Sequence, residues 1–240
     1  MLATMQPTAL ITGGAKRVGR AIAEHLAKAG FAVAFTYNTS SADADDLAAR
    51  IDGMAIKADL TDPTSAVTQI ADAFYGSFHR LDLLVNNASL YVPAPLDQTD
   101  LELSRRLMAI HYESPMLLCR EFAPMLRASR GHVVNMVDAM IERPMPSYLA
   151  YAASKSALWN LTLSLARELA PEVTVNGIAP GVVEWPANYP LAEQEKYLKR
   201  VPLARAGTPT DVAETVHFLA TGGSYITGQI IRLDGGRSIT

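Results

Sequence analysis

Two side chains that can exchange a proton with a substrate, Tyr151 and Lys155, stand four residues apart. They lie at the start of residues 150–169, where apolar residues recur with the period of a helix. Because four residues make about one helical turn, both side chains lie on the same face of the expected helix. An ammonium group on that face favours the phenolate and lowers the tyrosine pKa, which makes the hydroxyl a general acid or base nearer neutral pH. Taken alone, the pair is also typical of an ordinary, solvated helix end without a catalytic role.

A glycine-rich turn is the second feature with chemical meaning. It lies between a short apolar run, residues 9–12, and a helix-periodic run, residues 18–29. Gly13 permits a tight turn and Gly19 lets helix and strand pack closely, while the helix N-terminus offers free N–H groups and a positive dipole to a pyrophosphate. The residues of this turn expected to bind a dinucleotide are Gly13, Lys16, Arg17, Val18 and Gly19. The alternative is a purely structural strand–helix turn.

The residues after the second expected strand, 31–37, favour one dinucleotide. NAD sites usually carry an Asp or Glu there to hold the ribose 2′-hydroxyl. This chain instead has Tyr37, Asn38, Thr39 and Ser40. Neutral groups at that position, together with the basic pair in the glycine turn, suit a 2′-phosphate, so we predict NADP(H) as the cofactor.

Bulk composition excludes several classes of protein. The 240 residues carry a net charge of −3 without a long basic run, so we expect no nucleic-acid partner. The hydrophobic fraction of 49% allows a large core. The single cysteine, Cys119, fits a reducing cytoplasm. Residues 1–8 lack a signal-peptide pattern, and no apolar run reaches the about 18 residues that span a bilayer. We expect a cytoplasmic protein without a membrane span or a metal site.

The order of the expected elements predicts the fold class. Strands are expected at residues 9–12, 31–37, 54–58, 81–87, 131–137, 173–178 and 229–233, and helices at 18–29, 41–51, 63–78, 101–129, 150–169, 192–199 and 210–220. Pro115 predicts a kink in the long helix 101–129. Alternating strands and helices indicate an α/β domain, residues 1–240, whose parallel sheet of about seven strands has helices on both faces. Ligands of such sheets bind at the carboxyl ends of the strands.

The motifs together resemble the short-chain dehydrogenase/reductase family over nearly the whole chain. The matching motifs, in order, are Thr12-Gly13 with Arg17 and Gly19, then Asn86-Asn87-Ala88, then Tyr151 with Lys155, and Pro180-Gly181. The resemblance implies a Rossmann-type, doubly wound, three-layer fold and a homotetramer assembled through the long helices. It also implies that residues 182–208 form a loop and helix insertion that covers the substrate.

Three departures from the family pattern narrow the resemblance. The family usually has glycine at Arg17, serine at Asp138 and asparagine at His111. Arginine and aspartate at the first two positions resemble pteridine reductases, as does the string at residues 87–91 with its aromatic Tyr91. His111 and the residues around Tyr151 look most like the bacterial dihydromonapterin reductase branch. The resemblance therefore implies a pterin substrate.

The chemistry of Asp138 agrees with that substrate. An ionised carboxylate cannot donate to a ketone oxygen, and it repels a developing oxyanion. It accepts hydrogen bonds from the amino and ring N–H groups of a pterin. Arg17 can contact both a cofactor phosphate and the ring edge, and Tyr91 can stack on the ring. The less specific alternatives are a surface carboxylate for Asp138 and simple loop packing for Tyr91.

The resemblance implies roles for the remaining site residues. The expected reaction is hydride transfer from nicotinamide C4 to a C=N carbon of a dihydropterin, giving the tetrahydropterin, with Tyr151 supplying the proton directly or through Asp138 or water. Lys155 holds the nicotinamide ribose, and His111 either assists a water relay to that lysine or is structural. Further cofactor contacts are implied for Asp59, Leu60, Asn87, Ala88, Ser89, Pro180, Gly181 and Val182. Further substrate contacts are implied for Ser89 and for Trp185, which either packs on the ring or only anchors its loop.

Two other functions remain open at this point. One is an NADPH-dependent reductase of ordinary carbonyls or 3-oxoacyl thioesters, against which Asp138 counts. The other is a non-catalytic protein that senses NADPH. Such sensors can lose the tyrosine or the lysine, and both are present here.

Overall fold

A computed structural model describes residues 6–143, 145–186 and 188–240. Its centre is a seven-stranded, all-parallel sheet in the order β3-β2-β1-β4-β5-β6-β7. The strands are β1 (Thr8–Ile11), β2 (Ala32–Tyr37), β3 (Met54–Lys57), β4 (Leu83–Asn86), β5 (His132–Met136), β6 (Thr174–Pro180) and β7 (Ile230–Leu233). The strand order reverses direction between β1 and β4, which opens a crevice at the carboxyl ends of these strands.

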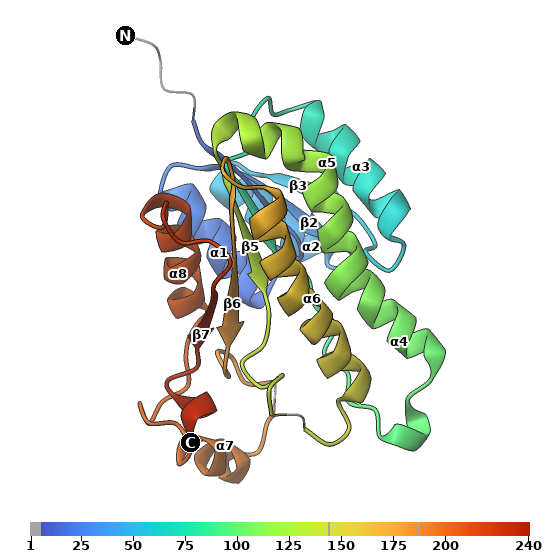
Figure 1. Ribbon diagram of the computed structural model, residues 1–240, viewed down its shortest axis with the longest axis vertical. Coiled ribbons are helices and arrows are strands. Elements are labelled where there is room, and N and C mark those ends of the chain that lie inside the picture. Colours follow the sequence, from blue (N-terminus) through green and yellow to red (C-terminus); the bar gives the residue numbers. More distant parts are fainter. Residues whose placement is uncertain (1–5, 144, 187) are drawn as a thin grey trace.

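Helices cover both faces of this sheet (Figure 1). They are α1 (Arg17–Lys28), α2 (Ser41–Ile51), α3 (Pro63–Tyr75), α4 (Leu101–Met108), α5 (Ser114–Ser129), α6 (Leu149–Glu168), α7 (Leu191–Leu198) and α8 (Pro209–Thr221), with short turns η1 (Leu96–Gln98), η2 (Ala109–Glu113) and η3 (Arg237–Ile239). Helices α1, α2 and α8 pack on one face, and α3, α5 and α6 pack on the other. The predicted Rossmann-type, three-layer α/β fold is confirmed.

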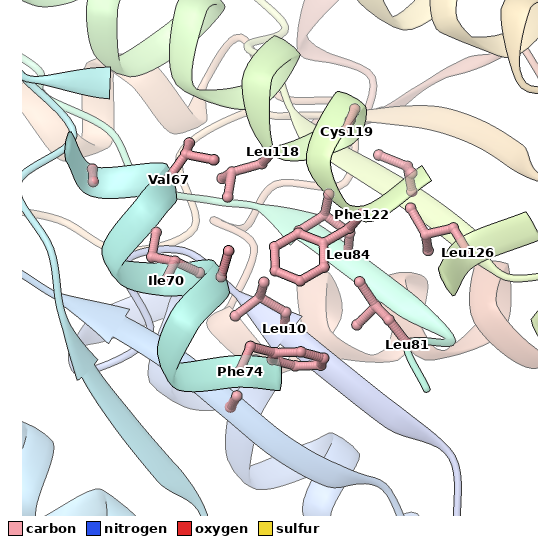
Figure 2. Close-up of a cluster of buried hydrophobic side chains, with 14 of the residues drawn as sticks. Leu10, Val67, Ile70, Phe74, Leu81, Leu84, Leu118, Cys119, Phe122 and Leu126 are labelled. Atoms are coloured by element: carbon pink, nitrogen blue, oxygen red, sulfur yellow. The ribbon is translucent and has the colours of Figure 1, made fainter. Parts of the chain in front are cut away.

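Two buried clusters hold the three layers together. Successive strand residues point to opposite faces, so Leu10 enters the cluster under α3 and α5, while Ala9 and Ile11 enter the cluster under α1 and α8. Figure 2 shows the first cluster, where the rings of Phe74 and Phe122 meet edge-on with centroids 5.1 Å apart. Truncating either ring to alanine should cost about 3–5 kcal/mol of stability. The sheet is therefore a rigid base for the loops at its carboxyl edge.

The long helix expected over residues 101–129 is interrupted. A π-helical turn, η2, separates α4 from α5. The sequence placed the break at Pro115, which lies in the first turn of α5, directly after η2. Proline has no N–H to donate to the preceding turn, so the backbone hydrogen bonds rearrange just before it. This rearranged turn carries His111 into the interior, where the side chain is buried.

The last helix also begins earlier than its sequence pattern indicates. We expected a start at Thr210, but Thr208 is the N-cap and forms a reciprocal capping box with Asp211. Pro209 occupies the first helical turn, where its missing N–H is harmless. Among the residues that the structure describes, no helix is both long and apolar enough to cross a membrane.

Candidate active site

Tyr151 and Asp138 meet at the carboxyl edge of the sheet. Tyr151 lies in the first turn of α6, and Asp138 follows β5 by two residues. The Tyr151 hydroxyl donates a hydrogen bond of 2.8 Å to Asp138 Oδ2. The other carboxylate oxygen, Oδ1, accepts the Met140 N–H at 2.7 Å. Both oxygens of Asp138 act as acceptors, which is the behaviour of an ionised carboxylate.

The Tyr151 pKa differs from the sequence-based expectation. Burial, followed by the negative charge and the hydrogen bond of Asp138, raises this pKa well above its ordinary value. The expectation that Lys155 lowers it is therefore wrong for this arrangement. The physical reason is that the phenol is buried and that the charged group in contact with it, Asp138, is an anion. A phenol with a raised pKa keeps its proton at neutral pH, so Tyr151 is present as the protonated acid.

Lys155 is buried one turn further along α6. Its Nζ donates to the Met136 carbonyl oxygen at 2.7 Å, at the end of β5. Desolvation lowers the pKa of Lys155 to about 8, although the Asp138 charge acts in the opposite direction. The lysine is therefore a fixed, desolvated cation beneath the same edge of the sheet as Tyr151.

His111 joins the loop after β4 to helix α6. Its Nδ1 lies 2.8 Å from Ser154 Oγ, and its Nε2 lies 2.9 Å from Ser89 Oγ and accepts the Leu90 N–H at 3.3 Å. Burial and then the Lys155 charge lower the His111 pKa to about 2. The ring is therefore neutral, and since Nε2 accepts from a backbone N–H, the proton belongs on Nδ1. His111 therefore connects the loop that carries Ser89 to the helix that carries Tyr151.

The glycine turn is built for close backbone approach. A Cβ on Gly19 would lie 2.2 Å from the Gly13 carbonyl oxygen, and Gly13 itself has a φ of 64°. The Asn87 side chain donates to the carbonyl oxygens of Thr12 and Gly13, each at 3.0 Å. Thr12 Oγ1 accepts the N–H groups of Asn87 and Ala88. The turn after β1 and the turn after β4 therefore hold each other in shape.

This turn leaves the N-terminus of α1 available to a ligand. Within the part of the chain that the structure describes, the N-cap residue, Lys16, makes no side-chain capping hydrogen bond. Uncapped N–H groups and a helix dipole suit a phosphate, so the arrangement fits a dinucleotide. Val18 and Gly19 belong to the first turn of the helix.

The two basic residues of the turn have carboxylate partners. Lys16 Nζ lies 2.9 Å from Asp43 Oδ2 at the start of α2. Arg17 Nε donates at 2.7 Å to Glu184 Oε2 in the segment after β6. Arg17 has a φ of 52°, a left-handed conformation that favours glycine. This conformation directs the arginine to the segment that was expected to cover the substrate.

The residues expected around the adenosine lie at the ends of β2 and β3. Asn38 and Thr39 are exposed, and no carboxylate occurs between Tyr37 and Ser40. Asp59 is exposed beside them, and Leu60 is buried. Hydrogen bonds from Thr61, the backbone N–H first, lower the Asp59 pKa.

Aromatic rings border Tyr151. Tyr91 and Tyr148 are stacked, with centroids 4.6 Å apart and planes at 20°. Tyr91 also meets Tyr151 edge-on at 4.9 Å, and half of the Tyr91 side chain is exposed. We call the stacked pair Tyr91 and Tyr148 the aromatic wall. Ser89, two residues before Tyr91, lies within hydrogen-bonding distance of His111, so the loop after β4 carries both the His111 contact and one ring of the wall. The exposed face of the wall offers a flat apolar surface next to the phenol.

A second aromatic group lies in the segment after β6. Trp185 stacks on Tyr189 at 5.2 Å and meets Tyr197 of α7 edge-on at 5.4 Å. The Tyr197 hydroxyl accepts the Val182 N–H at 3.2 Å, and Gly181 bonds to Leu233 of β7. Pro180 is the last residue of β6, so the residues expected to contact the nicotinamide, Pro180, Gly181 and Val182, lie at the carboxyl edge of the sheet. Trp185 follows them in the chain and packs against Tyr197.

Three further residues belong to the site and were missed in the sequence. Ser154 bridges His111 and the Tyr151 carbonyl oxygen, which it contacts at 2.7 Å. Tyr148 stands three residues before Tyr151, a helical spacing that could have revealed it. Glu184 had no such signal, because its partner Arg17 is 167 residues away in the sequence.

Comparisons with known proteins agree with this geometry. A family model described as enoyl-(acyl carrier protein) reductase matches residues 13–238. Pteridine reductase 1 of Leishmania tarentolae is 36% identical over 280 residues, which cover 98% of this chain and 97% of that protein. Dihydromonapterin reductase of Shigella boydii serotype 4 is 33% identical over 234 residues, covering 96% of each chain. A 3-oxoacyl-(acyl-carrier-protein) reductase of Synechocystis is 33% identical over 245 residues, covering 98% of each.

Proposed function

Because this chain belongs to the short-chain dehydrogenase/reductase family of oxidoreductases, we propose that it is an NADPH-dependent pteridine reductase. It reduces a C=N bond of a dihydropterin, of the dihydromonapterin, dihydrobiopterin or dihydrofolate type, to the tetrahydropterin. The observation that carries the proposal is the hydrogen bond between Tyr151 and Asp138, at the position where the family usually has serine. A reductase of simple ketones has no use for an anion there.

The chain's own residues supply the proton and the orientation. Bound NADPH supplies hydride from nicotinamide C4 to the imine carbon. Tyr151, kept protonated by burial and by Asp138, delivers its proton to the neighbouring ring nitrogen. Asp138 accepts hydrogen bonds from pterin N–H groups and so selects a nitrogen heterocycle over a carbonyl compound. One hydride and one proton complete the reduction.

Cofactor binding is assigned to the turn after β1 and its neighbours. The uncapped N-terminus of α1 holds the pyrophosphate, and Lys155 holds the nicotinamide ribose. The absence of a carboxylate between Tyr37 and Ser40 supports a 2′-phosphate, and Lys16 supplies positive charge nearby. Equilibrium titration should therefore give tighter binding of NADPH than of NADH. Equal or tighter binding of NADH would contradict the cofactor assignment.

The aromatic wall and the segment after β6 enclose the substrate. Tyr91, supported from behind by Tyr148, stacks on the pterin ring. Residues 182–208 form the cover, with Trp185 anchored against Tyr197. The ion pair between Arg17 and Glu184 connects this cover to the glycine turn. When the cover closes over the substrate, it excludes water from the reacting atoms.

Assembly and location follow the same family pattern. We assign a homotetramer in the cytoplasm. Exposed leucines on the outer helices support an assembly, namely Leu101 on α4 and Leu149 and Leu163 on α6. The single, buried Cys119 suits a reducing compartment.

One alternative has its own support. The description of the matching family model and the relative from Synechocystis favour a carbonyl or 3-oxoacyl-thioester reductase. Asp138 argues against it, because its ionised carboxylate lies 2.8 Å from the hydroxyl that would donate to a ketone oxygen. Repulsion between this carboxylate and a developing oxyanion raises the barrier.

A panel of substrates decides between the two functions. NADPH oxidation is followed with a dihydropterin, dihydrofolate, a small ketone and a 3-oxoacyl thioester under identical conditions. We expect turnover of the dihydropterin with a kcat/KM at least about 100-fold above those of the two carbonyl substrates. Robust turnover of only the carbonyl substrates would overturn the proposal.

A further inference from the structure

A basic groove is lined by residues outside the candidate active site. It has a volume of about 520 Å³ and is bounded by the end of α7 and the C-terminal turn η3. Four cationic side chains line it, from three separate segments of the chain: Arg143, Lys199, Arg200 and Arg237. Figure 1 shows α7 and the C-terminus close together below the sheet. A concentration of positive charge stands out on a chain whose net charge is −3.

Arg237 is the least compensated of these cations. It is only 9% exposed, and its Nε is buried without an acceptor among the residues that the structure describes. One face of the guanidinium lies over the Tyr197 ring at 5.7 Å, a cation–π contact that supplies no acceptor to Nε. Burying a guanidinium without an anionic partner is costly, so an anion in the groove would remove that cost.

Two carboxylates next to the groove residues are occupied elsewhere. Asp234 accepts the backbone N–H groups of Gly236 and Ser238, and Glu142 pairs with Arg232. Arg143 donates to the main-chain oxygen of Thr240.

Lys199 and Arg200 add two more cations without partners. Within 6–143, 145–186 and 188–240, no hydrogen bond or ion pair involves either side chain. The dipole of α7 favours cations at this helix end, but it does not account for Arg143 and Arg237, which come from other segments. We propose that the groove is a second anion-binding site, which takes a small anion of charge two or more, either a phosphate compound or a polycarboxylate.

The position of the groove links such an anion to the cover segment. Tyr197 separates the groove from the catalytic cleft: Arg237 lies over its ring, and its hydroxyl holds the backbone of Val182. Trp185 packs on the edge of the same ring. An anion bound by Lys199 and Arg200 therefore fixes α7 and, through Tyr197, the segment that begins at Val182. This site does not depend on the proposed reaction.

Calorimetric titration of the full chain with pyrophosphate and, separately, with citrate tests the site. The key variant is Lys199→Gln/Arg200→Gln, because both side chains are exposed and their removal leaves the fold intact. The matched control is Lys28→Gln/Lys196→Gln, which removes the same charge from α1 and from a position on α7 outside the groove. We expect at least one of the two anions to bind. The key variant should weaken that binding at least about tenfold and the control less than about twofold.

Hydrogen exchange gives a second readout. The anion should slow exchange of Leu191–Leu198 in the wild type and in the control, but not in the key variant. Preference for pyrophosphate or for citrate identifies the source of the anion. If neither anion binds, or if both variants weaken binding equally, the site does not exist. Arg237→Gln should also abolish binding. If that variant fails to fold, the variant Lys199→Gln/Arg200→Gln still decides whether the site exists.

Discussion

The Tyr151 hydroxyl and the Asp138 carboxylate form a hydrogen bond of 2.8 Å across thirteen residues of sequence. Asp138 is in turn fixed by the Met140 N–H, so the acceptor cannot rotate away without losing a second bond. The pair keeps a proton on the phenol and an anion beside it. This combination suits a substrate that offers N–H donors to the carboxylate and a basic nitrogen to the phenol.

Replacing Tyr151 by phenylalanine removes the proton donor and keeps the ring. Dihydropterin reduction should fall at least about 100-fold, because the hydroxyl that donates to Asp138 and supplies the proton is gone. NADPH affinity, measured by fluorescence titration, should change less than about threefold. An unchanged rate of NADPH oxidation would instead favour a protein that senses NADPH without catalysis.

Arg17→Gly separates backbone strain from side-chain function. Glycine adopts the φ of 52° freely, so the stability to denaturant should stay the same or rise by up to about 1 kcal/mol. The guanidinium is lost, so the KM for dihydropterin should rise about tenfold. Glu184→Gln breaks only the exposed ion pair, so it shows how much of the rise in KM comes from losing that pair rather than from losing an arginine contact to the substrate. An unchanged KM in Arg17→Gly would remove Arg17 from the substrate site.

His111 makes stability depend on acid. Its pKa is 6.5 in an unfolded chain and about 2 in the fold. Between pH 6.5 and about pH 2 the unfolded chain therefore binds a proton at His111 that the folded chain does not bind. The stability of the fold falls as the pH falls through this range. Between about pH 7 and 4.5 this amounts to about 2–3 kcal/mol.

The variant His111→Asn tests that contribution, since the family usually has asparagine there. Urea denaturation at the two pH values should show about 2–3 kcal/mol less acid destabilisation in the variant than in the wild type. Equal losses in both proteins would mean that His111 does not remain neutral in the fold.

Sequence patterns predicted what depends on local periodicity. The bounds of α2 matched the expected 41–51, and the strand–turn–helix around Gly13 followed from apolar spacing and glycine. The Tyr151–Lys155 spacing correctly placed both residues on α6. These features need only neighbours within about two helical turns.

Other features depend on contacts between distant segments. The partners of His111 come from the loop after β4 and from α6, and the Arg17–Glu184 pair joins residues 167 positions apart. The direction of the Tyr151 pKa shift also needed the tertiary structure, because burial and the contact with Asp138 raise this pKa. No local pattern encodes how deeply a side chain is buried.

The central claim is that Asp138 adapts the site to a nitrogen heterocycle. Its most direct test is the kcat/KM for a dihydropterin in the wild type and in Asp138→Ser, with NADPH affinity measured in parallel. We predict a fall in kcat/KM of at least about 100-fold with NADPH affinity within about threefold. A serine variant that reduces the dihydropterin as efficiently as the wild type would contradict the account.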